Sequence, residues 1–464
     1  MRKFLMYLCA MVFFTVATMV LSSAVYADTI RVGLLRSNHN QSSISVPTTS
    51  IEVGRGHADG TFNHIQTLNS AAGFTITASG EQVLVRAGGA GGAVQFTFIT
   101  GVAGSPQIRA ANGGTVGVGS NVYRGFIEFR PSGGNVSAIN VLPMEQYLYG
   151  VLPLEMSPSF NIEALRAQAV AARTFASYTR SYGRHTTWLD VCDSPSCCQS
   201  YLGAGREDAI TTQAVRDTAG LKMFNPGSSS PLFTPYFSSS GGATLNNENV
   251  WWATLSHLRG VPDFYEQDAR EWTRTFTWAQ LTSAVAAQAP NANIGTVTSV
   301  TTTHSPFGPV HSMTFTGTNG EWTARGENVR LMFRHAGGSL NSQNFQLEGG
   351  TATDSAVATA TNVTVTSGTA SRQAQVTDLY VVNNQNQVTR VSNAHISNGL
   401  AAGQAAGSAF AENVTVTGGA GITMNGRGWG HLVGMSQNGA NGMAQAGHDF
   451  HSILTHYYTG VEIR

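Results

Sequence analysis

The chain has 464 residues, of which 42% are hydrophobic and only 11% are charged. Charged residues make up about 25% of an average globular protein, so sparse charge combined with 52 glycines favours a β-rich extracellular protein. Because 26 basic residues balance 26 acidic ones, we expect no basic surface for nucleic acid.

The N-terminus predicts export. A basic start, Arg2–Lys3, precedes an apolar stretch over residues 4–21, and the small residues Val25 and Ala27 suit a cleavage site. Cleavage after Ala27 would remove residues 1–27 as a signal peptide. An uncleaved membrane anchor is the alternative, because about 18 apolar residues are just enough to span a bilayer. In both cases we expect the body of the protein in the cell wall, or on the extracellular or periplasmic face of the membrane.

Composition and pattern divide the remaining chain into zones. Residues 28–120 show short alternating strands separated by turns rich in Gly, Ser and Asn. Residues 121–349 are mixed, residues 350–415 predict an inserted β-rich segment, and residues 416–464 return to a compact Gly/aromatic pattern. The expected fold class is α+β, a β-rich core packed on one long Ala-rich helix, with an N-terminal β-rich region and the insertion.

The long helix is predicted over residues 162–182. Asn161 suits the N-cap and Gly183 suits the terminating position. Small apolar residues recur on one face at spacings of three and four, which predicts close packing against a sheet. Gln168 and Arg173 are unusual in such a helix. If buried, Arg173 needs a carboxylate partner, whereas on a solvated face neither residue would need one.

The stretch before this helix contains a candidate acid, Glu155. Its neighbours, Leu152–Leu154 and Met156, are apolar. Burial raises the pKa of a carboxyl group because it disfavours the charged form, and a general acid working at neutral pH needs such a pKa. A glutamate in a surface loop, with an ordinary pKa, is the alternative.

The cysteines that follow the predicted signal peptide are Cys192, Cys197 and Cys198. An odd number in an exported chain indicates either a disulfide with one remaining thiol or a metal site. His185 lies seven residues before Cys192, so a zinc site of the closed, structural type is possible. Adjacent cysteines do not easily face one ion, so both explanations stay open.

Several segments resemble the stage II sporulation protein D (SpoIID) family, which includes the LytB amidase enhancers. One is Glu145–Ala176, which opens with EQYLYGVLPLEM and continues in the predicted helix with ALRAQAVAARTFA. Others are YFSSSGG at residues 236–242 and LRGVPD at residues 258–263. The sharpest is GRGWGH at residues 426–431, followed by VGMSQ. The resemblance makes residues 121–349 and 416–464 two parts of one catalytic core.

The resemblance implies a lytic transglycosylase that acts on peptidoglycan glycan strands stripped of stem peptides. Glu155 would be the catalytic acid and base, and the products would carry 1,6-anhydro-muramic ends. Zinc would bind His185, Cys192 and Cys198. Cys197 stands where such proteins have a histidine, and it is itself able to act as a ligand. The residues expected to contact or orient the sugar are Glu145, Tyr147, Gln168, Arg173, Ser239, Ser240, Trp429, His431, Ser436 and Gln437.

Two other classes of function stay open. One is a noncatalytic enhancer that binds a cell-wall amidase, and the other is a wall-binding protein that uses residues 28–120. Most glycoside hydrolases need two carboxylates, and the sequence offers no clear second one, since we expect Glu145 to support the fold. The expected partners are therefore peptidoglycan strands and, for an enhancer, an amidase.

Overall fold

The computed structural model describes residues 28–349 and 413–464 except positions 59, 184, 186, 252, 267 and 268, and it adds the backbone of short strands between residues 351 and 390. The predicted signal peptide, 1–27, and most of the predicted insertion, 350–415, lie outside the described residues. Helices and several β-sheets occur together, which confirms the α+β class.

The chain divides into two compact units. Unit 1 holds the residues up to Pro235 together with Ala444–Thr455 and Gly460–Arg464. Unit 2 holds Tyr236–Met443 and His456–Thr459. Two helices near the C-terminus, α7 (Gln437–Gln445) and α8 (Phe450–Tyr457), contain residues of both units.

Two sheets form the β part of unit 1. The larger has the order β13 (Val191–Cys192), β1 (Thr29–Gly33), β12 (Asn135–Pro143), β11 (Phe126–Ser132), β8 (Ser105–Ala110), β3 (Ser50–Gly56) and β4 (Phe62–Asn69). The smaller has the order β2 (Ser43–Val46), β5 (Phe74–Ser79), β6 (Gln82–Ala87) and β7 (Val94–Phe98).

The two sheets of unit 1 pack face to face. Strands β11 and β12 contact β5 and β6, and alternate residues such as Ile127, Phe129, Ile76 and Val85 are buried between them. The opposite face of the larger sheet is therefore its outer face. Strands from both sides of the predicted boundary at residue 120 share this sheet.

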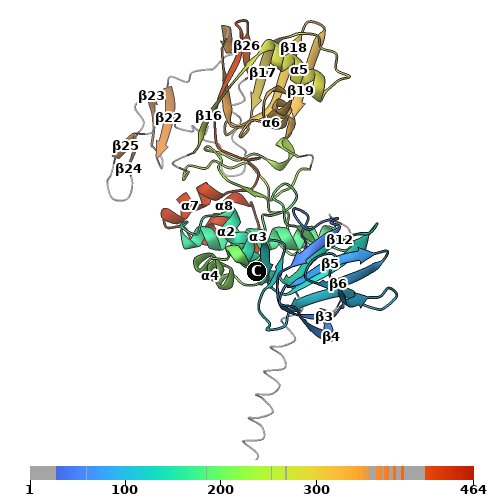
Figure 1. Cartoon of the computed structure of the whole chain (residues 1–464). Helices are drawn as coiled ribbons and strands as arrows, with labels where there is room; N and C mark the ends of the chain where they lie inside the picture. The colour runs from blue at the N-terminus through green and yellow to red at the C-terminus, as the bar shows by residue number, and fades with distance from the viewer. Residues whose placement is uncertain are drawn as a thin grey trace, which may run out of the picture. The chain divides into compact units, whose positions relative to one another are not determined.

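Three α-helices lie wholly in the described part of unit 1. They are α2 (Met144–Glu155), α3 (Ile162–Tyr182) and α4 (Ala209–Asp217), and α3 contacts both of the others (Figure 1). As predicted, the Asn161 side chain caps α3 by accepting from the Glu163 backbone N–H, and Gly183 ends it at φ 60°. Gln168 and Arg173 are fully buried, so the solvated-face alternative for them is wrong. A short strand, β14 (Met223–Phe224), pairs with β29 (Glu462–Ile463).

Unit 2 contains two larger sheets around one hydrophobic core. One sheet has the order β16 (Glu271–Thr277), β27 (Gly421–Arg427) and β20 (Phe345–Glu348). The other has the order β19 (Gly320–Arg325), β18 (Val310–Gly317), β17 (Val297–His304), β26 (Asn413–Thr417) and β21 (Thr351–Asp354). Helix α5 (Trp278–Gln288), α6 (Asn328–Leu331) and the 3-10 helix Met332–Ala336 contribute to the core.

Smaller elements complete the described backbone. In unit 2, β15 (Tyr236–Phe237) pairs in parallel with β28 (Met435–Ser436). Within the predicted insertion, β22 (Asn362–Ser367) pairs with β23 (Ala370–Gln375), and β24 (Tyr380–Val382) pairs with β25 (Val388–Arg390). In unit 1, β9 (Val116–Val118) pairs with β10 (Asn121–Tyr123).

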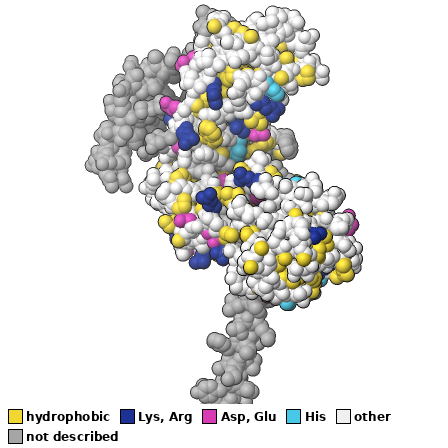
Figure 2. Space-filling view, viewed as in Figure 1, with side chains coloured by type: hydrophobic (Ala, Val, Ile, Leu, Met, Phe, Trp, Pro, Cys, Tyr) yellow, Lys and Arg dark blue, Asp and Glu magenta, His cyan; other side chains and the backbone are white. Residues whose placement is uncertain are grey.

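The surface agrees with the sparse charge of the sequence. On the face in view, basic and acidic side chains are scattered and no single-sign patch dominates (Figure 2). Among the described residues, no helix combines the length and the apolar character that crossing a bilayer requires.

Candidate functional site

Glu155 is the last residue of α2, and its side chain is half-buried. Its Oε1 accepts a hydrogen bond from the Ser200 backbone N–H over 2.6 Å. Burial raises the pKa of Glu155 above its ordinary value, although hydrogen bonds from the backbone and side chain of Ser200 oppose the shift. The C-terminal end of a helix carries partial negative charge, so α2 does not favour ionisation either. Glu155 is therefore suited to carrying a proton.

The residues beside Ser200 connect the same segment to the helices. The buried Tyr147 hydroxyl donates to Gln199 Oε1 over 3.1 Å, and Gln199 Nε2 donates to the Ala172 carbonyl over 3.3 Å. The Tyr201 hydroxyl donates to Asn140 Oδ1 over 2.7 Å. The segment Gln199–Tyr201 is thus fixed to α2, α3 and β12 while its middle residue contacts Glu155. Tyr147 lies in the interior and supports this segment.

Glu145, at the start of α2, is the partner of Arg173. Arg173 Nε and Nη2 donate to the two carboxylate oxygens of Glu145 over 2.8 and 2.6 Å. The remaining Arg173 bonds reach the carbonyls of Ala169, Leu221 and Val215. The pair ties α2 to α3 and positions the helix that ends at Glu155. As expected, the buried arginine holds a carboxylate.

Gln168 is also fully buried in α3. Both its amide nitrogen and its amide oxygen are without a hydrogen-bond partner among the residues that the structure describes. A buried amide without partners is costly, so these two atoms are available to a bound water or ligand. Its expected role at the sugar stays a prediction.

Four side chains after α3 form one compact cluster, His185, Cys192, Cys197 and Cys198, whose ligand atoms all lie within 4.8 Å of one another. Cys192 and Cys197 form a disulfide. His185 Nε2 lies 3.0 Å from Cys198 Sγ and 3.9 Å from Cys197 Sγ. Three sulfur atoms and one imidazole nitrogen are a donor set that could hold a metal ion once the disulfide is reduced. Both alternatives drawn from the sequence therefore use the same three cysteines, and the metal site adds His185.

In unit 2, predicted residues from the segments 236–242 and 426–437 lie side by side. Ser239 and Trp429 exchange backbone hydrogen bonds of 3.1 and 2.8 Å, and β15 lies beside β28. The Trp429 side chain is 46% exposed, and the Arg270 guanidinium carbon lies 5.9 Å from its ring centroid. An exposed indole of this kind offers a flat apolar surface on which a sugar ring could stack.

Ser240 lies between two buried carboxyl groups. Its Oγ is 2.9 Å from Asp263 Oδ2 and 2.7 Å from Glu266 Oε2. One hydroxyl has only one hydrogen to donate, so two bonds require one carboxyl group to carry a proton. Burial, with a smaller contribution from the Glu266 charge, raises the pKa of Asp263 to about 6. Glu266 Oε2 also accepts from the backbone of Ser240 and Gly241 over 2.7 and 3.0 Å.

His431 is held as a neutral imidazole. Its Nδ1 accepts from the Val433 backbone N–H over 3.1 Å, and its ring packs against Trp251 and Phe237 with centroids 5.0 and 5.4 Å away. Burial, with the Arg330 charge adding to it, lowers the pKa of His431 to about 3. Because Nδ1 accepts, the neutral ring carries its hydrogen on Nε2, which can donate one hydrogen bond, and the ring does not carry charge at neutral pH.

Ser436 and Gln437 follow at the start of α7. Ser436 is fully buried, and its Oγ accepts from the Gly439 backbone N–H over 3.1 Å. The Gln437 side-chain nitrogen is buried without a hydrogen-bond partner among the described residues. The structure therefore groups Ser239, Ser240, Trp429, His431 and Ser436 within unit 2, but their contact with a sugar stays a prediction.

Sequence reasoning did not single out several residues that the structure puts in these clusters. Ser200 and Gln199 follow directly after the cysteines, so their adjacency to a predicted metal site was a usable signal. Asp263 ends the LRGVPD segment, and Glu266 lies three residues later. Nothing local distinguishes these two carboxylates from exposed ones, because only the fold buries them against Ser240.

Comparison with known proteins bears on the same segments. Residues 132–224 match a family model described as SpoIID, stage II sporulation protein, and this range includes Glu145, Glu155, Arg173 and the sulfur cluster. An uncharacterized protein of Brachyspira hyodysenteriae is 26% identical over 343 residues, covering 74% of this chain and 72% of its own length.

Two relatives from Bacillus subtilis carry more informative names. One is called stage II sporulation protein D and is 25% identical over 70% of this chain and 76% of its own length. The other is called amidase enhancer and is 25% identical over 68% of this chain, but over only 40% of its own length. The family model and these relatives confirm the resemblance to the SpoIID/LytB family seen in the sequence.

Proposed function

We propose that this protein is a peptidoglycan lytic transglycosylase with Glu155 as its acid and base. The observation that supports this most directly is the setting of Glu155, a half-buried carboxyl group with a raised pKa whose ionised form keeps one backbone donor, Ser200. Such a group can give up a proton and take it back, which is what a mechanism with a single carboxyl group requires.

The proposed reaction is balanced without water. The protonated Glu155 donates to the glycosidic oxygen between N-acetylmuramic acid and N-acetylglucosamine, and the bond from that oxygen to the anomeric carbon breaks. The Glu155 carboxylate then takes the proton of the muramic 6-hydroxyl, whose oxygen bonds to the anomeric carbon. A 1,6-anhydro ring forms, and Glu155 ends protonated, ready for the next cycle.

We further propose that zinc occupies the cluster of His185, Cys192, Cys197 and Cys198 when the cysteines are reduced. Three thiolates and one imidazole suit a tetrahedral zinc ion of the structural type, which supplies cross-linking and no open coordination position. Bound there, zinc would hold the segment that carries Ser200 against Glu155. The disulfide between Cys192 and Cys197 would serve the same purpose in an oxidising environment.

Export to the cell wall is part of the proposal. It rests on the N-terminal sequence, with its basic start, apolar stretch and small residues before Asp28. Glycan strands are found outside the cytoplasm, so the proposed substrate and the proposed location agree.

The test uses the chain from Asp28 to Arg464 on peptide-free glycan strands, with products identified by mass spectrometry. The wild type should release anhydro-muramic products, and Glu155→Gln should reduce their formation by at least a hundredfold, since general acid–base catalysis contributes about 10²–10⁴-fold. Glu81→Gln, at an exposed turn position, is the matched control and should keep full activity. Equal activity in Glu155→Gln and wild type would reject the mechanism.

A noncatalytic enhancer is the second candidate, because one relative is named amidase enhancer. An enhancer would release no product alone and would accelerate a purified peptidoglycan amidase on whole sacculi. If wild type, with zinc supplied, cuts no glycan but accelerates the amidase, and Glu155→Gln does so equally well, the enhancer function replaces the enzymatic one.

A further inference from the structure

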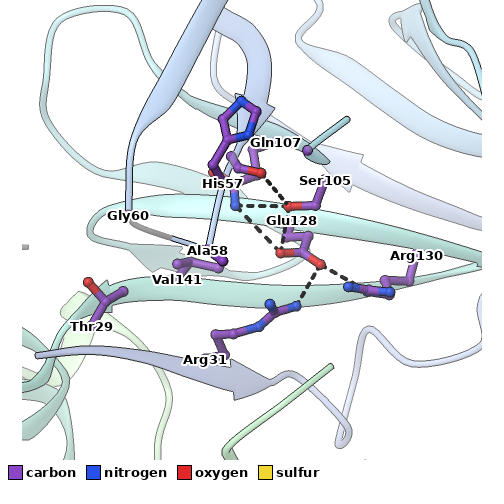
Figure 3. Close-up of a pocket in the computed structure, with 12 residues that line it drawn as sticks. Thr29, Arg31, His57, Ala58, Gly60, Ser105, Gln107, Glu128, Arg130 and Val141 are labelled. Carbon is purple, nitrogen blue, oxygen red and sulfur yellow. Dashed lines mark hydrogen bonds and ion pairs between the residues drawn. The ribbon is translucent and has the colours of Figure 1, made fainter. Parts of the chain in front are cut away.

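The outer face of the larger sheet of unit 1 contains a polar pocket of about 370 Å³ (Figure 3). Its walls come from strands β1, β3, β8, β11 and β12 and from the turn after β3. This volume lies at the lower end of the range of about 300–1,000 Å³ found for small-molecule sites. The pocket is distinct from the Glu155 cluster, and none of the residues predicted from the sequence lines it.

Glu128 lies in this pocket with all its hydrogen-bonding capacity directed at the protein. It is 1% exposed. Its Oε1 accepts from Arg31 Nη2 over 2.8 Å and from Arg130 Nε over 2.9 Å, and its Oε2 accepts from Ser105 Oγ over 2.9 Å (Figure 3). The carboxylate therefore holds both arginines in place.

The fold makes room for this arrangement at Gly56. A Cβ atom at that position would lie 2.1 Å from the Gln107 amide group. Without one, the Gln107 side chain lies across strand β3, and its Nε2 points toward Glu128 Oε2 at 3.5 Å. The polar network is built into the sheet, with its partners on β1, β8 and β11, which makes the cavity a preformed one.

Among the described residues that line the pocket, positive charge exceeds negative charge. Two guanidinium groups share one carboxylate, and they are the accessible members, since the Arg31 and Arg130 side chains are 30% and 44% exposed while Glu128 is buried. Arg31 Nε is buried and has no hydrogen-bond partner among the described residues. A buried donor without an acceptor is costly, so an acceptor bound at this position would be stabilising.

The polar pocket continues into a small apolar one. This extension, of about 30 Å³, shares six residues with the main pocket, among them Thr29, Gln107 and Val141, and adds Thr61, Phe126, Leu142 and Pro143. It has room for a methyl group, and apolar walls favour a methyl group over a water molecule, which needs polar partners. A pocket with two exposed guanidinium groups and a methyl-sized apolar extension suits a small carboxylate that also carries a methyl group.

We propose that this pocket binds a 2-substituted propionate, a carboxylate next to a methyl-bearing carbon, with Arg31 and Arg130 contacting the carboxylate. Guanidinium groups recognise carboxylates through paired charge-assisted hydrogen bonds. In a cell wall this chemistry occurs in the lactyl group of muramic acid and in the terminal alanine of stem peptides. The choice of wall ligands rests on the proposed function, whereas the carboxylate chemistry does not.

The experiment titrates the purified protein with N-acetylmuramic acid, N-acetylglucosamine and acetyl-D-alanyl-D-alanine by calorimetry. N-acetylglucosamine is the neutral match for N-acetylmuramic acid because it lacks only the lactyl group. We expect at least one of the two carboxylates to bind about tenfold or more tightly than N-acetylglucosamine, and the stronger one identifies the source. Equal binding of all three, or no binding, overturns the proposal.

A charged substitution at an exposed position on the pocket's edge tests the role of charge without removing a buried residue that the fold needs. Ala58 is exposed and lines the pocket, and its side chain makes none of the hydrogen bonds to Glu128. Ala58→Glu places a competing carboxylate near the arginines and should weaken carboxylate binding about tenfold or more, whereas Ala58→Gln adds the same bulk without charge and should bind nearly as wild type. Equal affinities in the two variants would overturn the role of the charge.

The Glu155→Gln variant separates this proposal from the proposed function. It should bind the propionate ligand as wild type does, because Glu155 does not line this pocket. Binding without glycan cleavage by wild type would leave this site standing and reject the transglycosylase. Glycan cleavage without carboxylate binding would support the transglycosylase and reject the pocket as a carboxylate site.

Discussion

The Ser200 backbone N–H donates to Glu155 Oε1 over 2.6 Å, only two residues after Cys198 of the sulfur cluster. The candidate acid and the cluster are therefore joined by one short piece of chain. Cross-linking of the cysteines, by a disulfide or by a metal, restricts the segment that supplies the donor. The acid's protonation then depends on the conformation of a loop as well as on burial.

The Ser200 side chain provides a test of this dependence. Its hydroxyl lowers the pKa of Glu155 against the raising effect of burial. Ser200→Ala removes that bond to the ionised form, so the pKa of Glu155 should rise further. A general acid works while protonated, so kcat/KM falls as pH rises through this pKa, and in Ser200→Ala the fall should occur at higher pH. Ser200→Thr keeps a hydroxyl and should resemble wild type; a shared pH profile for all three would contradict the argument.

The sulfur cluster should hold either the disulfide or a zinc ion, but not both at once. Reduced protein given zinc should retain about one ion per chain, and Cys198→Ser should retain much less. Oxidised protein should bind none, because the disulfide removes Cys192 and Cys197 as ligands. Elemental analysis together with thiol titration measures both states. Reduced protein that exposes all its thiols to the reagent and keeps no zinc would argue for a disulfide alone.

The Glu145–Arg173 pair should show strong coupling in unfolding experiments. Glu145→Gln leaves a fully buried guanidinium uncompensated and should cost about 3–5 kcal/mol of unfolding free energy. Arg173→Met leaves a carboxylate that is 30% exposed and hydrated, so its cost should be smaller.

The double variant tests the coupling itself, because it should be more stable than the sum of the two single losses predicts. The more exposed pair Arg124–Glu207 is the matched control, where each change should cost about 1 kcal/mol or less. If the double variant of the buried pair loses as much unfolding free energy in urea as the two single variants together, the two residues act separately.

Asp263 predicts a pH dependence of stability. The pKa of Asp263 in the folded protein, about 6, lies above its unfolded value of about 3.9. The contribution of Asp263 to the free energy of unfolding is therefore complete below pH 4 and is lost as pH rises through 6. The loss should be on the order of 3 kcal/mol. In Asp263→Asn, the unfolding free energy of unit 2 should decline less between pH 4 and 7 than in wild type, as measured by urea unfolding. An unchanged decline in the variant would assign the effect to other titrating groups.

Several features were readable in the sequence because their causes are local. The helix over residues 162–182 follows from a capping side chain, a run of small apolar residues and a terminating glycine, all within one segment. The apolar neighbours of Glu155 predicted its raised pKa, and the spacing of His185 and the cysteines predicted their cluster. The family resemblance also lies in short continuous motifs.

The tertiary structure decided the pairings between distant residues. Arg173 was expected to hold a carboxylate, but only the packing of α2 on α3 selects Glu145, 28 residues away. The pairing of Ser240 with Asp263 and Glu266, and the pocket around Glu128, joins strands and loops whose separation in the chain carries no local signal. Burial of a charge is a property of the closed fold, because water is excluded only once remote segments meet, so these sites appear only in three dimensions.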